Sequence, residues 1–132
     1  MDTNDTNKSE SEIIYKDLSY KVIGLAMQVH NELGFGFLEK VYENALMVLF
    51  RENGIDAVQQ FPVSVMFHGQ VVGDYFCDIL VEDSIIIELK AQDRIAEIHK
   101  VQTLHYLRAT KYRLGLLINF GKQRLEHERL VL

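Results

Sequence analysis

Three residues in the middle of the chain, Asp78, Glu88 and Lys90, have the types and spacing of a hydrolytic metal site. Glu88 and Lys90 are two apart in an extended segment, so their side chains leave the same face of a sheet, where Asp78 on a neighbouring strand can join them. Carboxylates are ligands that Mg²⁺ prefers, and a bound cation polarises phosphoryl oxygens and acidifies water. A lysine beside them can orient or deprotonate that water, or stabilise charge on the phosphate. The trio indicates phosphodiester hydrolysis with Mg²⁺ or Mn²⁺.

The sequence around the trio strengthens this interpretation. An acidic residue followed at a distance by Glu-x-Lys is common by chance, and charged residues at strand ends are commonly just solvated. Here Glu88-Leu89-Lys90 directly follows Ile85-Ile86-Ile87, a β-branched run typical of a strand that is covered on both faces. Charged groups that end a buried strand need partners or a role, which favours a functional site.

The periodicity of apolar residues predicts the elements that position the trio. Helical spacing covers residues 17–33 and 38–52, and it returns over residues 95–109. Extended runs include residues 63–67, the stretch that starts at residue 71 and leads to Asp78, residues 85–87 and residues 114–120, with 124–132 as a candidate fifth strand. Pro62 is placed at a strand start, where its missing N–H is least harmful. The predicted order is α-α-β-β-β-α-β, with or without a final strand.

Length and composition predict one domain. The chain has 132 residues and 48% hydrophobic content, enough for a single core. We expect a flexible polar tail over residues 1–12 and one domain over residues 13–132. No apolar run is long enough to cross a membrane, and the single cysteine, Cys77, excludes an internal disulfide. A cytoplasmic protein with no membrane partner is expected.

The charge distribution neither requires nor excludes a nucleic-acid partner. The net charge is -5, which opposes binding to phosphates. Residues 1–89 hold 5 Lys+Arg against 15 Asp+Glu, whereas residues 90–132 hold 9 against 4. The C-terminal third is therefore basic, and clustered carboxylates elsewhere would be offset by a divalent cation.

A series of motifs resembles a known family. The segment Gly36-Phe-Leu-Glu39-Lys-Val-Tyr42 is similar to the motif that names the GxxExxY proteins, a group within the PD-(D/E)XK nuclease superfamily. Further similar segments, in order, are Val29-His30-Asn-Glu-Leu33-Gly34, Asp78, Glu88-Leu-Lys90, Ile98-His99, Gln102-x-x-x-Tyr106 and Gly115-Leu-Leu-Ile-Asn119-Phe120-Gly121. Cys77 stands where the superfamily name has proline. The resemblance implies an α/β fold with a restriction-endonuclease-like α-β-β-β-α-β core, in which helices flank a central mixed sheet, plus an extra N-terminal helix.

The resemblance also assigns roles on the helices. It makes Glu39 a third metal ligand, with Tyr42 hydrogen-bonding into the site, although Glu39 would also suit a helix N-terminus. It places Gln102 and Tyr106 beside the metal to hold the substrate backbone or the catalytic groups. His99 extends that row at helical spacing, and a solvated helix face is the alternative. His30 either caps the first helix or points at the site.

Three functions are compatible with these residues. The leading hypothesis is a metal-dependent nuclease acting on DNA, with RNA as the other substrate, and with a homodimer if both strands of a duplex are cut. A second hypothesis is a catalytically silent adaptor that binds nucleic acid or protein and retains the nuclease fold. A third is a hydrolase of nucleotides or other small phosphates, which would not need a long basic groove.

Overall fold

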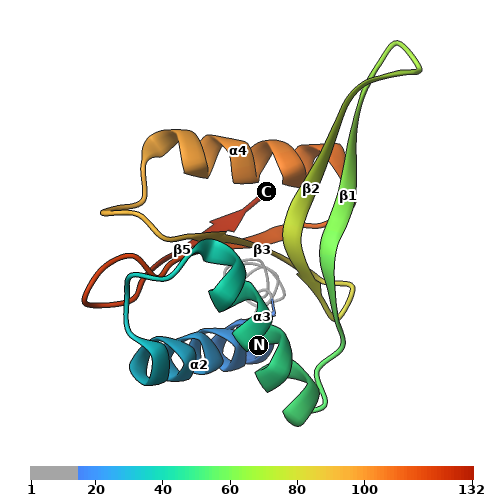
Figure 1. Ribbon diagram of the computed structural model, residues 1–132. Coiled ribbons are helices and arrows are strands. Elements are labelled where there is room, and N and C mark those ends of the chain that lie inside the picture. The colour runs from blue at the N-terminus through green and yellow to red at the C-terminus, as the bar shows by residue number, and fades with distance from the viewer. Residues whose placement is uncertain (1–14) are drawn as a thin grey trace, which may run out of the picture.

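A mixed sheet lies between two layers of helices in the computed structural model, which describes residues 15–132 (Figure 1). The tail expected over residues 1–12 lies outside the described residues. The elements in chain order are α2 (Lys16–Leu33), α3 (Glu39–Glu52), β1 (Ala57–Phe67), β2 (Gln70–Val81), β3 (Ile85–Lys90), α4 (Glu97–Ala109), β4 (Leu114–Asn119) and β5 (Glu126–Val131). The predicted order is confirmed, and the candidate fifth strand is present.

The five strands lie in the order in which they occur along the chain. Neighbouring strands are antiparallel except β3 and β4, which run parallel over their whole length. A parallel pair needs a long crossover connection, and α4 supplies it. This is the restriction-endonuclease-like mixed sheet that was expected, with α2 as the additional N-terminal helix.

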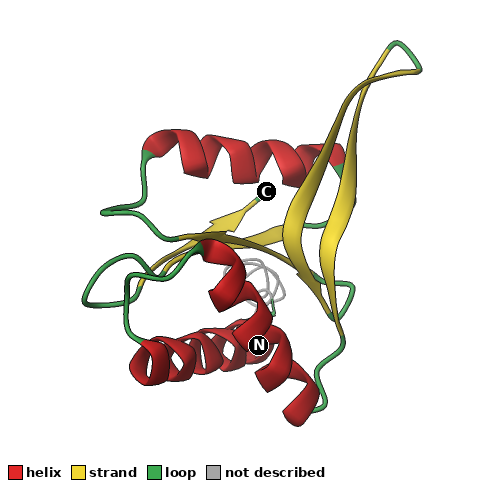
Figure 2. Cartoon of the chain, viewed as in Figure 1, coloured by secondary structure: helices red, strands yellow, loops and turns green. Residues whose placement is uncertain are grey.

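Helices cover both faces of the sheet (Figure 2). Alternate residues of β3 point to opposite faces, so Ile85, Ile87 and Leu89 pack in the core beneath α2 and α3, whereas Ile86 packs beneath α4. All three isoleucines are fully buried, as the continuous apolar run predicted. None of the helices in residues 15–132 is long and apolar enough to cross a membrane.

The hairpin formed by β1 and β2 extends beyond the rest of the sheet (Figure 1). Its turn has positive φ at His68 (48°) and Gly69 (76°), the combination whose twist suits a two-residue hairpin turn. The expectation that Pro62 starts a strand is wrong, because β1 begins at Ala57. Proline is tolerated inside β1 because β1 is an edge strand of the sheet.

Gly121, just after β4, provides a test of how tightly the loop that follows β3 is packed. A Cβ at Gly121 would lie 2.2 Å from the backbone nitrogen of Gln92 and 2.3 Å from its carbonyl oxygen, so one of the two loops would have to move. We expect Gly121→Ala to lower the free energy of unfolding by about 3 kcal/mol or more, measured by chemical denaturation. Gly24→Ala is the control, since a Cβ there meets nothing within 4 Å and helix propensity should add about 0.5–1 kcal/mol. Equal effects of the two substitutions would contradict the prediction.

Candidate active site

The candidate carboxylates lie where β2 and β3 separate. The ladder between these strands ends at the Ile79–Ile87 pair, and Asp78 and Glu88 occupy the next position. There the backbone N–H of Asp78 donates to Glu88 Oε1 (3.0 Å), and the backbone N–H of Leu89 donates to Asp78 Oδ2 (2.7 Å). Side chains therefore replace the missing ladder bonds, and they hold the two carboxylates together. We call this place the fork.

The backbone of β1 is distorted beside the fork. Gln60 lies opposite Asp78 and has φ 52°, a left-handed conformation that is uncommon for a residue other than glycine. The alternation of side chains along β2 reverses at the same level, because Ile79 packs in the core beneath α2 and α3 whereas Cys77 packs beneath α4. Asp78 consequently lies between the two layers, within electrostatic range of groups on both α3 and α4.

The two carboxylates repel each other in a poorly solvated place. Glu88 is only 5% exposed, and burial followed by the charge of Asp78 raises its pKa to about 8, although the Asp78 N–H and Lys90 act in the opposite direction. Burial is also the main cause that raises the pKa of Asp78, opposed first by the N–H of Leu89. Such a pair gains stability from a proton or from a cation.

Lys90 extends the site beyond the fork, as the spacing predicted. Its charge lowers the pKa of Glu39, Asp78 and Glu88, and it also lowers the pKa of His99. Within residues 15–132 the Lys90 amine forms no ion pair shorter than 4 Å with a carboxylate. The amine is therefore close to the acidic cluster while remaining available to another partner.

The donor set at the fork fits a divalent cation held by two carboxylates. Mg²⁺ usually binds through one or two carboxylates and completes its shell with waters and substrate phosphates. Asp78 and Glu88 would be those two ligands, and their mutual repulsion would be relieved. Across the described part of the chain, no three His, Cys, Asp or Glu side chains converge closely enough to hold a metal by themselves. Glu39 interacts with Asp78 and Lys90 electrostatically rather than as part of a closed cluster.

Sequence reasoning missed a second acidic residue on α3. Glu43 is 3% exposed, and its two carboxylate oxygens accept hydrogen bonds from Gln59 Nε2 (2.6 Å) and Gln60 Nε2 (3.0 Å). Its charge raises the pKa of Asp78. Glu43 follows Glu39 by four residues and therefore shares its helix face, a spacing that could have identified it. Its bonds fix the distorted part of β1 against α3.

The predicted row on α4 borders the fork from the other side. Gln102 Nε2 donates to the hydroxyl oxygen of Tyr106 (3.0 Å), and Tyr106 is 6% exposed. Burial, with the charges of Glu88 and Asp78 adding to it, raises the pKa of Tyr106 to about 12. His99 lies in the first turn of α4, where its Nδ1 accepts the N–H of Ala96 (3.0 Å). Its side chain therefore caps α4 in addition to lying near Lys90.

Tyr42 and His30 hold loops on the opposite side of the sheet. The Tyr42 hydroxyl donates to the carbonyl of Gly34 (2.7 Å) and accepts the N–H of Phe37 (3.2 Å), and its ring stacks on Phe120 at 4.5 Å. His30 Nε2 lies 2.7 Å from the carbonyl oxygen of Lys122, so this nitrogen carries the proton. The structure does not bring either side chain into the row formed by Gln102 and Tyr106.

Asn119, the last residue of β4, supports the end of β3. It is fully buried, and its side-chain amide bonds both the N–H and the carbonyl of Gln92 at 3.0 and 2.9 Å. Its Oδ1 also accepts the N–H of Gly121. The loop that follows Lys90 is thereby fixed to the adjacent parallel strand.

Comparison with known proteins agrees with this geometry. The model of a family described as the PD-(D/E)XK nuclease superfamily matches residues 16–130, and the chain therefore belongs to that superfamily. No curated protein matches the sequence.

Two solved structures share the fold. One is an alkaline exonuclease (LHK-Exo) from Laribacter hongkongensis, with 14% identity, a TM-score of 0.51 and coverage of 70% of this chain. The other is SSO0001, with 20% identity, a TM-score of 0.52 and coverage of 94% of this chain. The chain spans 55% and 59% of the lengths of these proteins, respectively.

The pKa of Glu88 predicts how stability depends on pH. The ordinary pKa is 4.5 and the folded-state pKa is about 8, so neutral Glu88 contributes stability that is complete below about 4.5 and is lost as pH rises through about 8. Glu88→Gln keeps an acceptor for the Asp78 N–H and removes the charge. In metal-free buffer we expect the variant to melt several degrees above the wild type at pH 8.5 and close to it at pH 5.

Thermal unfolding followed by circular dichroism across this pH range measures the difference. Glu52→Gln is the matched control, because Glu52 is an exposed carboxylate at the end of α3. If the melting temperatures of the wild type and Glu88→Gln changed in parallel with pH, burial of the Glu88 charge would not affect the stability of the fold.

Proposed function

We propose that this protein is a divalent-metal-dependent nuclease, using Mg²⁺ or Mn²⁺ to hydrolyse phosphodiester bonds of DNA or RNA. The observation that carries the proposal is the pair of hydrogen bonds at the fork, from the Asp78 N–H to Glu88 and from the Leu89 N–H to Asp78, which hold two poorly solvated carboxylates together beside Lys90. Membership of a nuclease superfamily over residues 16–130 supports the same chemistry. We also propose that the chain belongs to the GxxExxY group, on the segment from Gly36 to Tyr42.

Each residue of the site has a definite part in this mechanism. Asp78 and Glu88 would hold the cation, which when bound would polarise the phosphodiester and acidify the attacking water. Lys90 donates to that water to orient it, or to the phosphate oxygens as negative charge develops on them. Gln102 and Tyr106 offer an amide and a hydroxyl for the substrate backbone, and cutting both strands of a duplex would require a second copy of the chain.

Substitution of Lys90 tests the chemistry separately from metal binding. We expect Lys90→Ala to lower the cleavage rate at least about 100-fold, because the developing charge loses its donor. The melting temperature should still rise on addition of Mg²⁺, since both carboxylates remain. Cleavage of labelled single-stranded and duplex oligonucleotides, with and without EDTA, is the measurement.

Lys111→Ala is the control, because Lys111 is exposed and pairs with Asp83 beyond the end of α4. Cleavage that survives Lys90→Ala at the wild-type rate would contradict the assignment.

Glu39 and Asp78 are expected to differ in their effects on metal dependence. Asp78→Asn removes one of two direct ligands, so saturating activity with Mg²⁺ should be lost. Glu39→Gln removes a neighbouring charge, and we expect a reduction of about tenfold or less that higher Mg²⁺ concentrations largely restore. Titrating Mg²⁺ against the cleavage rate of each variant distinguishes these behaviours. Equal, unrecoverable losses in both variants would instead make Glu39 a third direct ligand.

One observation favours the catalytically silent adaptor as the second candidate. Without a cation Glu88 is largely protonated at neutral pH, because its pKa is about 8, and within residues 15–132 no third carboxylate closes the site. A protein that kept this fold only for binding would have no need of a closed metal site. Nucleic-acid binding without cleavage in either Mg²⁺ or Mn²⁺ would support the adaptor and would exclude the nuclease.

A further inference from the structure

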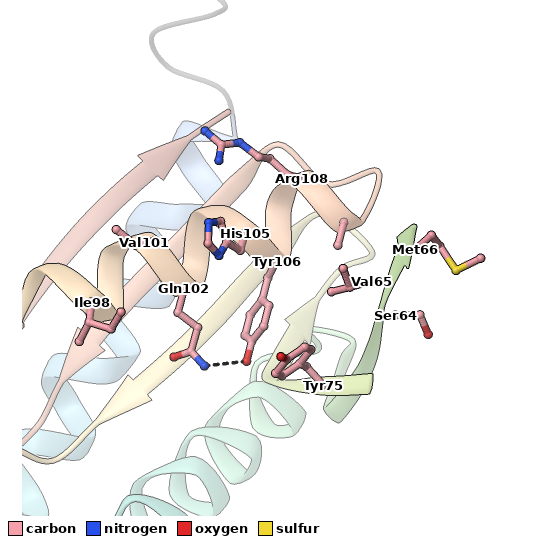
Figure 3. Close-up of a pocket in the computed structure, with 11 residues that line it drawn as sticks. Ser64, Val65, Met66, Tyr75, Ile98, Val101, Gln102, His105, Tyr106 and Arg108 are labelled. Carbon is pink, nitrogen blue, oxygen red and sulfur yellow. Dashed lines mark hydrogen bonds between the residues drawn. The ribbon is translucent and has the colours of Figure 1, made fainter. Parts of the chain in front are cut away.

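A cleft lies between the projecting hairpin and α4 (Figure 3). Its volume is about 780 Å³, within the range of roughly 300–1,000 Å³ that is typical of ligand sites. The hairpin contributes Met66 and Tyr75 to its walls, and α4 contributes Ile98, Val101 and Tyr106. The cleft is therefore lined mainly by apolar and aromatic groups, and Tyr106 and Gln102 are the lining residues that also have a role in the mechanism proposed above.

The exposure of these side chains indicates that the cleft binds a partner. Ile98 is 68% exposed, Met66 is 55% exposed and Tyr75 is 47% exposed, although all three come together around one hollow. Solvent-exposed apolar groups that are scattered singly need no explanation, but a contiguous set commonly marks a binding site. The aromatic rings are paired as well, since the centroids of Tyr75 and Tyr106 lie 6.0 Å apart at 45°.

The cleft is continuous with the fork. Tyr106 lines the cleft and also lies within electrostatic range of Glu88 and Asp78, and Tyr75 precedes Asp78 by three residues on β2. Figure 3 shows Gln102 and Tyr106 leaving α4 on the same side, next to the ring of Tyr75. A molecule bound in the cleft would therefore lie on the side of Tyr106 that adjoins the fork.

The charges around the cleft are poorly suited to a duplex backbone. Arg108 and His105 are the basic lining residues, and Figure 3 shows Arg108 leaving α4 away from the Tyr75 ring. The neighbouring fork is acidic, and binding of duplex phosphates depends on many Lys and Arg contacts. Flat aromatic and apolar walls instead suit the face of a nucleobase, which stacks on aromatic side chains whatever its sequence.

We propose that the cleft receives an unpaired base of the substrate strand, so that the preferred substrate is nucleic acid that is single-stranded next to the cleaved bond. The proposal rests on the proposed nuclease function, because it places the base beside the same carboxylates. In a duplex, stacking on neighbouring base pairs would hide the face that Tyr75 contacts. Tyr75 offers the exposed aromatic face for stacking, and Ile98 and Val101 of α4 provide apolar lining for the base.

Binding assays test the cleft without depending on cleavage. Lys90→Ala in Mg²⁺ is mixed with a short fluorescent single strand, the same sequence as a duplex, and a strand of the same length built from abasic residues. Fluorescence anisotropy should give tighter binding to the single strand than to either of the other two probes. Adding Tyr75→Ala should weaken binding to the single strand by about tenfold or more, and Tyr75→Phe should retain it.

Tyr20→Ala is the matched control, because Tyr20 is 81% exposed on α2, across the sheet from the cleft. Equal affinity for the abasic strand, or unchanged affinity in Tyr75→Ala, would overturn the cleft proposal even if the wild type cleaves nucleic acid. Base-dependent, Tyr75-dependent binding without any cleavage by the wild type would support the cleft and would overturn the nuclease function instead.

Discussion

The site depends on two hydrogen bonds at the fork, which the carboxylates of Glu88 and Asp78 accept from the backbone N–H groups of Asp78 and Leu89. Where the β2–β3 ladder stops, the backbone N–H groups of Asp78 and Leu89 would lose their partners in a largely buried place, and such groups need an acceptor. Each is satisfied by a carboxylate from the opposite strand. The bonds that satisfy these backbone groups therefore also fix two carboxyl groups side by side, with Glu88 almost completely buried. The same two hydrogen bonds therefore complete the local backbone structure and create a pair of carboxyl groups that a bound cation would stabilise.

The fork exists because β2 pairs with β1 along its whole length but pairs with β3 only at its C-terminal end. Near its end it belongs to the central sheet, and before that it pairs only with β1 in the projecting hairpin. Gln60, with its left-handed backbone conformation, lies at the level where pairing with β3 begins. Glu43 stabilises this conformation by accepting a hydrogen bond from the Gln60 side-chain amide. A non-glycine residue held in such a conformation by surrounding contacts is typical of a functional region. Because the hairpin projects away from the central sheet, a space remains between the hairpin and α4, and this space is the cleft.

Much of this arrangement could be predicted from sequence, and the remainder depends on contacts between distant residues. Apolar periodicity gave the order of helices and strands, and the run of isoleucines identified β3 as buried. Spacing alone brought Glu88 and Lys90 to one face. Spacing from Glu39 could have pointed to Glu43, but the role of Gln60 could not be found in that way, because it arises where a distorted strand meets a helix residue 17 positions earlier. For Tyr42, helical spacing gives the face of the helix, but the loop that its hydroxyl binds is visible only in three dimensions.

The acidity of the site has a consequence for how substrate is admitted. Negative charge at Asp78 and Glu39 opposes the approach of a polyanion, although Lys90 lies beside them. In the mechanism proposed above, a phosphodiester would approach together with a cation that shares the site, which would couple substrate entry to the condition for hydrolysis. Affinity would then come from elsewhere. Stacking in the cleft, as proposed, would supply it through uncharged surface, so that a chain with a net charge of -5 could hold nucleic acid without a continuous basic groove.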